Sequence, residues 1–230
     1  MPSADVSTIA GRIADIRSSI ARACERAGRE AAEVTLIGVT KTFTVDDVDE
    51  AIAAGLEDFG ENRAQELLPK VEEASRRRLH ARWHFIGHLQ RNKVRDVLPH
   101  IVALHSLDSL RLAATIESEA ERTGLERLRC YIEVNVAEEA SKEGVPPAEL
   151  PGLLSSLAVL PHLEVAGLMT VAPQVPDAEQ VRPVFRALRE LASANGLRGL
   201  SMGMSEDYAV AIEEGATVVR VGRALFGPRV

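Results

Sequence analysis

Apolar residues at the start of the chain recur at helical spacing. Ile9, Ile13, Ile16 and Ile20 follow one another at intervals of three or four residues, and Gly28 comes after them. One side of a helix over this stretch would be apolar, and a glycine is typical of a helix end. The pattern predicts an amphipathic helix ahead of the main fold.

Beyond this segment, short runs rich in β-branched residues alternate with longer stretches of helical periodicity. Glycine, proline or asparagine closes them, as expected of turns. The short runs predict eight strands, over residues 34–41, 58–62, 82–87, 101–108, 129–136, 163–171, 197–203 and 217–222. The stretches between them predict helices, such as those over 45–55, 91–100, 109–124 and 205–215.

This alternation predicts the fold class. Strands separated by helices pair in parallel through right-handed crossovers. Eight such strands favour a closed barrel over an open sheet, and no G-x-G-x-x-G sequence follows any of them to indicate a dinucleotide site. We therefore expect an α/β protein, a TIM (β/α)8 barrel with an extra N-terminal helix. It would be a single domain over residues 1–230, in which the helix of residues 1–30 packs on the barrel.

Composition narrows the range of partners and compartments. The 230 residues are 46% hydrophobic and 27% charged, which is ordinary for a globular domain, and the net charge of -7 argues against a nucleic-acid partner. The arginine run 76–78 closes an acidic helix and is typical of a solvated face. Cys24 and Cys130 have neither a disulfide framework nor a zinc spacing. With no secretory signal and no apolar run long enough for a bilayer, we expect a cytoplasmic monomer without membrane contact.

In a barrel of this kind, chemistry is expected at the carboxyl ends of the strands. Lys41 ends the first strand. In a partly apolar mouth its amine would lose some stabilisation of the charged form and become a nucleophile for an aldehyde. A solvated lysine that caps a strand is an equal alternative. Asn62 ends the second strand and is either a ligand at the mouth or a turn residue or helix cap.

Polar residues also occur within strands. His84 and His88 are four residues apart, about 13 Å along a strand, so they cannot share a metal ion, and we predict no metal site. A hydrogen-bonded structural histidine is the favoured interpretation of each. Glu133 and Asn135 share one face of the fifth strand, where a structural hydrogen-bond network is favoured over a ligand contact.

The loops after the last two strands are candidates for anion binding. TIM barrels often hold phosphate there, and residues 203–207 and 222–227 offer glycine for close backbone approach, the Ser205 hydroxyl and the charge of Arg223. Ordinary glycine-containing turns are an equal alternative. Arg220 lies inside the last strand, where a buried guanidinium needs a partner. That partner is either a buried carboxylate or a ligand.

Six short motifs carry a resemblance to a known family. They are VTKT around Lys41, FGENRAQE at 59–66, WHFIGHLQRNK at 83–93, GLMT at 167–170, LSMGMSEDY at 200–208 and VRVGRALFG at 219–227. In this order and spacing, from 34 to 227, the chain resembles the pyridoxal phosphate homeostasis protein family. These proteins are the single-domain relatives of the alanine racemase barrel and bind pyridoxal 5'-phosphate (PLP) in the fold-type III manner.

The resemblance implies a cofactor site. Lys41 would hold PLP as an internal aldimine, Ser205 and the backbone around Gly222 would hold the phosphate, and Arg220 would face the pyridine nitrogen. Arg223 stands where many relatives have Thr or Ser. The implied cofactor-binding residues are Lys41, Asn62, His84, Ser201, Gly203, Met204, Ser205, Arg220, Gly222 and Arg223.

The resemblance also implies a role, which is to hold and deliver PLP in intracellular PLP homeostasis without robust catalysis. Alanine racemases add a β-rich domain with an acid/base tyrosine, whereas this sequence ends at Val230 and contains only Tyr131 and Tyr208. Arg220 beside the ring nitrogen would leave it unprotonated and make the ring a poorer electron sink. PLP-dependent apoenzymes are the candidate recipients. A racemase or lyase of low activity and a Schiff-base aldolase without PLP are the alternatives.

Overall fold

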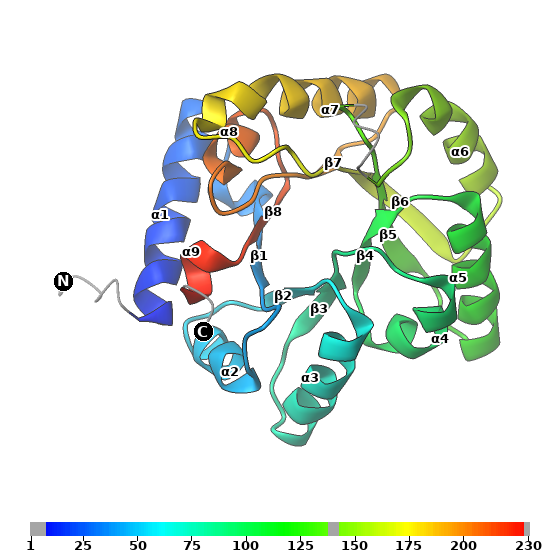
Figure 1. Ribbon diagram of the computed structural model, residues 1–230, viewed down its shortest axis with the longest axis horizontal. Coiled ribbons are helices and arrows are strands. Elements are labelled where there is room, and N and C mark those ends of the chain that lie inside the picture. The colour runs from blue at the N-terminus through cyan, green and yellow to red at the C-terminus, as the bar shows by residue number, and fades with distance from the viewer. Residues whose placement is uncertain (1–7, 138–142, 228–230) are drawn as a thin grey trace.

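Eight parallel strands close into a barrel in the computed structural model, which describes residues 8–137 and 143–227 (Figure 1). The strands pair in chain order, and β8 closes the barrel against β1. Their bounds are β1 (Thr35–Val39), β2 (Asp58–Glu61), β3 (Arg82–Phe85), β4 (Ala103–Leu107), β5 (Leu128–Glu133), β6 (Leu163–Met169), β7 (Gly199–Ser201) and β8 (Val218–Val221). Seven of them lie within the predicted strands, and β5 begins one residue before its predicted strand, so the predicted α/β barrel is confirmed.

Helices surround the barrel (Figure 1). They are α1 (Ile9–Arg26), α2 (Val45–Ala53), α3 (Ala64–Arg76), α4 (Val94–Val97), α5 (Leu110–Thr123), α6 (Leu150–Leu157), α7 (Arg182–Ala194), α8 (Tyr208–Glu213) and α9 (Arg223–Phe226). The predicted helix over 91–100 is the one that differs. It is broken into α4 and two 3₁₀ turns, and the second turn contains Pro99, which has no N–H for an α-helical hydrogen bond.

The extra helix α1 covers the barrel beside α2, α8 and α9 (Figure 1). The Thr8 side chain caps it by accepting a hydrogen bond from the Gly11 amide, and its four isoleucines are buried as predicted. Arg12 donates to the Leu225 carbonyl oxygen at 2.7 Å, which ties the helix to the segment after β8. Residues 1–7 of the predicted N-terminal segment lie outside the described residues.

The two faces of the strands carry different side chains. On β4, Leu104 and Leu107 belong to the large apolar core between strands and helices, whereas His105 is buried away from that core. A small apolar group fills part of the barrel interior, and it consists of Ile37, Tyr131, Met169 and Val218. Polar side chains occupy much of the remaining interior.

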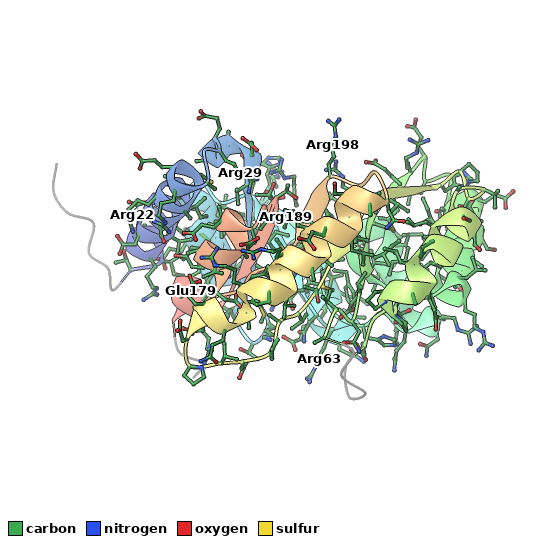
Figure 2. The ribbon with its side chains drawn as sticks, turned by 90° about the horizontal axis from the view of Figure 1, so that it is seen from above. Arg22, Arg29, Arg63, Glu179, Arg189 and Arg198 are labelled. Carbon is green, nitrogen blue, oxygen red and sulfur yellow. The ribbon has the colours of Figure 1, made fainter. Side chains whose placement is uncertain are left out.

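Figure 2 shows Arg198, just before β7, and Arg63, just after β2, projecting from opposite ends of the barrel. The carboxyl ends of the parallel strands lie on the side of Arg63, and the candidate site residues follow these ends.

Arg76 and Arg77, at the end of α3, are exposed and pair with Glu73, as expected of a solvated face. Cys24 and Cys130 are free, buried thiols. Within residues 8–137 and 143–227, no helix is long and apolar enough to cross a membrane.

Candidate functional site

A cavity of about 760 Å³ opens at the carboxyl ends of the strands. Its walls come from the ends of β1 and β8, from Ile86 after β3, and from the segments after β6 and β7. The predicted residues that line it are Lys41, Met204, Ser205, Arg220, Gly222 and Arg223. Residues separated by more than 160 positions in the sequence therefore meet at one site.

Lys41 follows β1, and the backbone around it is held from the side of α3. The Thr40 hydroxyl donates to Glu61 Oε1 at 2.6 Å. Lys70 Nζ lies 2.5 Å from the same oxygen and 2.6 Å from the Thr40 carbonyl oxygen. On the other side of Lys41, the Thr42 amide donates to Glu66 Oε2 at 2.8 Å. We call Thr40, Glu61, Glu66 and Lys70 the Lys41 clamp.

The clamp contains a buried carboxylate, that of Glu61. The Glu61 side chain is fully buried, and burial raises its pKa even though Lys70 and Thr40 act to lower it. Within the described part of the chain, Glu61 Oε2 has no hydrogen-bond partner. Among the described residues, Lys70 makes the one contact that neutralises this carboxylate at ion-pair distance.

Thr42 also has an uncommon backbone conformation. Its φ of 70° lies in the left-handed region, which β-branched residues rarely adopt. This turn immediately follows Lys41, so it contributes to the direction in which the chain leaves β1.

The loop after β7 forms another wall of the cavity. Gly203 has a φ of 94°, and a Cβ there would lie 2.7 Å from the Ala211 Cβ, so only glycine fits the turn. Gly203 itself shapes the wall without lining the cavity. Asp207 Oδ1 accepts a hydrogen bond from the Met204 amide at 2.6 Å, which fixes the loop around Ser205.

The loops after β7 and β8 contact each other. The Ser205 hydroxyl accepts a hydrogen bond from the Ala224 amide at 3.4 Å, and Arg223 forms an exposed ion pair with Glu206 at 3.3 Å. The arginine at the position that departs from the family pattern thus lines the cavity and contacts an acidic residue. A hydroxyl, backbone amides and a cation meet on this wall, and this is the chemistry that an anion requires.

Arg220 is buried at the bottom of the cavity. Its Nη1 donates to the Ser201 carbonyl oxygen at 2.8 Å and to the Ser201 hydroxyl at 2.6 Å, and its Nη2 donates to the Thr170 carbonyl oxygen at 3.0 Å. Its partners are thus uncharged oxygens rather than a carboxylate. Burial lowers the pKa of Arg220 to about 10, against the opposing charges of Glu133 and Asp207, so the guanidinium is charged at neutral pH.

Ser201 begins a row of polar side chains that crosses the barrel interior. Its hydroxyl lies 2.8 Å from His105 Nδ1, His105 Nε2 lies 3.0 Å from His84 Nδ1, and His84 Nε2 lies 2.9 Å from Asp58 Oδ1. We call Asp58, His84, His105, Ser201 and Arg220 the interior chain. Its far end is neutralised by Arg82, which donates to both oxygens of Asp58 at 2.9 and 2.6 Å.

The structure thus divides the predicted site residues. Ser201 and His84 lie in the interior chain, beneath the cavity, and His84 has the hydrogen-bonded position favoured from the strand pattern. Asn62 lines a separate cavity of about 450 Å³ together with His88 and Lys93. In the described ranges Asn62 Oδ1 has no hydrogen-bond partner. Residues Asn62, His84, Ser201 and Gly203 are absent from the lining of the main cavity within the described chain.

The two polar residues of the fifth strand also lie outside the main cavity. Glu133 ends β5, while Asn135 lies beyond it, and both line a third cavity with Glu143. Burial, with the nearby charge of Glu143, raises the pKa of Glu133 to about 7. Glu133 acts on Arg220 through its charge and is not a hydrogen-bond partner.

Asp58, His105, Glu61 and Lys70 are the structural contributors that the sequence did not single out. A signal exists for His105, because it directly follows Leu104, which belongs to the apolar core, and side chains alternate between the two faces of a strand. No comparable signal exists for the pair of Glu61 and Lys70, because the contact between the two side chains depends on how α3 packs on β2.

Comparisons with known proteins agree with this architecture. A family model described as alanine racemase, N-terminal domain, matches residues 14–230. A relative from Pseudomonas aeruginosa is 45% identical over 226 residues and covers 97% of each chain. A relative from Aquifex aeolicus is 44% identical over 224 residues, which are 95% of this chain and 97% of the relative. Both are named pyridoxal phosphate homeostasis protein.

Solved structures give the same result. PipY of Synechococcus elongatus, solved with PLP bound, superposes with a TM-score of 0.84 at 34% identity and covers 96% of this chain and all of its own. An alanine racemase from Corynebacterium glutamicum shares the fold alone, with a TM-score of 0.64 at 20% identity over 91% of this chain and 59% of the racemase. From the fold, the family model and these full-length relatives, the chain belongs to the pyridoxal phosphate homeostasis protein family of alanine racemase N-terminal-type barrels.

Proposed function

We propose that the chain binds PLP in the main cavity, on Lys41, and takes part in PLP homeostasis without robust catalysis. One observation carries the proposal: Lys41 lines the same cavity as Ser205, Gly222 and Arg223. PLP presents an aldehyde and a phosphate on one small ring. A nucleophilic amine and an anion site on one cavity are the two features that such a molecule requires.

The residues present fit PLP in size and chemistry. A volume of about 760 Å³ is within the range of small-molecule sites. The Lys41 nitrogen would bond to the aldehyde carbon, and the carbonyl oxygen would leave as water to give a Schiff base. Backbone amides and the Ser205 hydroxyl can donate to phosphate oxygens. Arg220 can only donate hydrogen bonds, so it would face the ring nitrogen of PLP, which would act as the acceptor.

The absence of robust catalysis is inferred from the same residues. Bound PLP supplies an electron sink for carbanions, and this sink is weaker when the ring nitrogen stays unprotonated beside an arginine. Two-sided proton transfer also needs a second acid/base group besides Lys41. Among the described residues that line the cavity, Glu206 and Asp207 are the ones that carry a carboxyl group. Asp207 is committed to the Met204 amide, and Glu206 pairs with Arg223.

The names of the relatives support the homeostasis role, and the PLP-bound PipY structure supports the cofactor. Delivery of PLP to dependent apoenzymes, a monomeric state and a cytoplasmic location stay predictions. The alternative of a racemase or lyase of low activity has the alanine racemase-type barrel in its favour.

An absorbance spectrum before and after borohydride tests the cofactor assignment. We expect a visible band in the wild-type protein with PLP, loss of this band on reduction, and one label per chain on the peptide that contains Lys41. Lys41→Arg keeps the charge but removes the primary amine, so it should take no label. Lys93→Arg, at the second cavity, is the matched control and should be labelled as the wild type is. A label on Lys93 alone would contradict the assignment.

Turnover tests the non-catalytic part separately. We expect no appreciable racemisation of alanine by the PLP-loaded protein. Turnover near the ordinary enzyme range of about 1–10³ s⁻¹ would instead establish the racemase alternative. Because this assay uses protein already shown to hold PLP, its result is independent of the labelling result.

A further inference from the structure

The interior chain links the cavity to the opposite end of the barrel, and its two ends have fixed hydrogen-bonding roles. Arg220 can only donate, and the ionised Asp58 can only accept. Burial acts to raise the pKa of Asp58, but hydrogen bonds from His84 and Arg82 outweigh it and hold the pKa below its ordinary value. Any arrangement of protons between these ends must satisfy both constraints.

The constraint at Asp58 determines the tautomer of the nearest histidine. The short contact of 2.9 Å between His84 Nε2 and Asp58 Oδ1 requires a proton on His84 Nε2. His105 is completely buried, and burial, together with the charge of Arg220, holds its pKa well below the ordinary value, so it is neutral. One proton then lies on His105, at either Nδ1 or Nε2.

Only one of these positions leaves every donor with an acceptor and both histidines neutral. If His105 Nε2 carries the proton, it donates to His84 Nδ1 at 3.0 Å, and His105 Nδ1 is free to accept from the Ser201 hydroxyl at 2.8 Å. The opposite arrangement would place a second proton and a charge on His84. It would also leave the Ser201 hydroxyl proton without its acceptor on His105.

In the first arrangement all hydrogen bonds run in one direction, from Arg220 through Ser201, His105 and His84 to Asp58. Because its proton points at His105, the Ser201 hydroxyl presents a lone pair to Arg220 Nη1 at 2.6 Å. Without an acceptor on His105, the hydroxyl could rotate and donate elsewhere, and Arg220 would lose one of the three hydrogen bonds that orient it.

We propose that His105 and His84 are positioning residues for Arg220, which act through Ser201 to hold the guanidinium as a donor toward the ring nitrogen of PLP. This inference rests on the proposed function, because it takes that ring nitrogen as the acceptor. In the described chain neither histidine lines the cavity, so we infer that their influence on PLP passes through Arg220. The ring of Tyr131 also stacks on the ring of His105, with 4.5 Å between the two ring centroids.

PLP titration of a chain-breaking variant tests the proposal. His105→Phe keeps a ring against Tyr131 but removes both nitrogens, and Ser201→Ala breaks the same chain with a smaller change. We expect each variant to bind PLP about three- to tenfold more weakly, which is the range for one lost hydrogen bond. The double variant should bind PLP as tightly as whichever single variant has the lower affinity, since both changes interrupt the same chain of hydrogen bonds.

Matched measurements separate positioning from a purely structural role. Ser106→Ala is the control on the same strand, because its hydroxyl donates to the Gly87 carbonyl oxygen outside the interior chain, and its PLP affinity should equal that of the wild type. If His105→Phe lowers only the melting temperature and leaves PLP affinity unchanged, the proposal is wrong. Effects of His105→Phe and Ser201→Ala that multiply in the double variant would also overturn it.

Nitrogen NMR of histidine-labelled protein tests the proton arrangement directly, with or without PLP. We expect bare Nδ1 and protonated Nε2 nitrogens on both His84 and His105. A protonated Nδ1 on His105 would overturn the proposal. A wild-type protein that binds no PLP would instead refute the proposed function, so the two failures are distinguishable.

Discussion

The Lys41 clamp and the interior chain reach the same cavity from opposite sides of the barrel wall. In the clamp, between β2 and α3, Glu61 and Lys70 lie in direct contact and are almost fully buried. In the interior chain, the charged residues Asp58 and Arg220 stand at the two ends, and neutral His105 and the Ser201 hydroxyl lie between them. The clamp acts on the backbone on either side of Lys41, whereas the interior chain acts on one side chain, that of Arg220.

This difference in charge placement implies a difference in what each region contributes. A contact ion pair that loses one partner leaves a buried charge, which destabilises the whole fold. A chain of hydrogen bonds that loses a neutral middle member leaves both end charges with other partners. Damage to the clamp should therefore be seen mainly in stability, and damage to the interior chain mainly in the affinity for PLP.

Lys70→Met should produce the largest effect. Methionine has a similar length, but it leaves the Glu61 carboxylate without its neutralising contact, and the expected loss of unfolding free energy is about 3–5 kcal/mol. The pKa of Glu61 is already raised in the folded state and should rise further in the variant. A raised carboxyl pKa favours the protonated native state, so stability falls as the pH rises from the unfolded pKa to the folded one. Urea unfolding at several pH values measures both effects.

Lys93→Met is the control for removing a lysine near the mouth. Lys93 is partly exposed at the second cavity, and its loss should change the unfolding free energy by no more than about 0.5 kcal/mol, as for most surface substitutions. Equal losses for Lys70→Met and Lys93→Met, or a Lys70→Met loss that shrinks as the pH rises, would contradict the importance of the buried pair.

Arg220→Ala should lower the affinity for PLP more than it lowers the stability of the fold. We expect PLP affinity to fall by about one to two decades, because a charge-assisted hydrogen bond is worth roughly 1.5–3 kcal/mol. Schiff-base formation at Lys41 should persist at high PLP concentration, since it depends on the amine and the aldehyde. Absorbance titration of the variant measures both.

The stability of the apoprotein separates this expectation from a structural role for Arg220. Because its hydrogen-bond partners among the described residues are uncharged oxygens, removal of the guanidinium breaks no ion pair there. A loss of about 3–5 kcal/mol in the apoprotein, with unchanged PLP affinity, would mean that Arg220 is part of the architecture instead.

The outward and inward faces of the strands differ in how far the sequence predicts them. Alternation along each strand identifies the outward apolar residues, such as Leu104 and Val219, because the helices that cover them have apolar faces of their own. The interior chain could not be predicted this way. His105 and Ser201 are 96 positions apart, and their contact depends on the register of every strand between them.

The same reasoning applies to the candidate site. Lys41 and the glycine loops could be predicted because the carboxyl ends of barrel strands meet at one mouth. Asn62 also follows a strand, but it faces a separate cavity, at a point where the chain passes so close that a Cβ on Gly87 would lie 2.4 Å from the Asn62 carbonyl oxygen. Such a close approach of two loops has no signal in either loop alone.

The smallest expected effect concerns the turn after Lys41. Thr42 and Arg78 have positive φ angles of 70° and 58°, and a side chain costs about 1–2 kcal/mol in this region. Glycine removes that strain but loses about 0.5–1 kcal/mol through its freer unfolded chain. Thr42→Gly and Arg78→Gly should therefore each raise the unfolding free energy by about 0.5 kcal/mol.

Only Thr42→Gly should weaken PLP binding, by about twofold, because it loosens the turn beside Lys41, while Arg78 lies in the turn after α3. Thermal unfolding and PLP titration of the two variants measure this, and equal PLP affinities would mean that the clamp alone holds Lys41 in place.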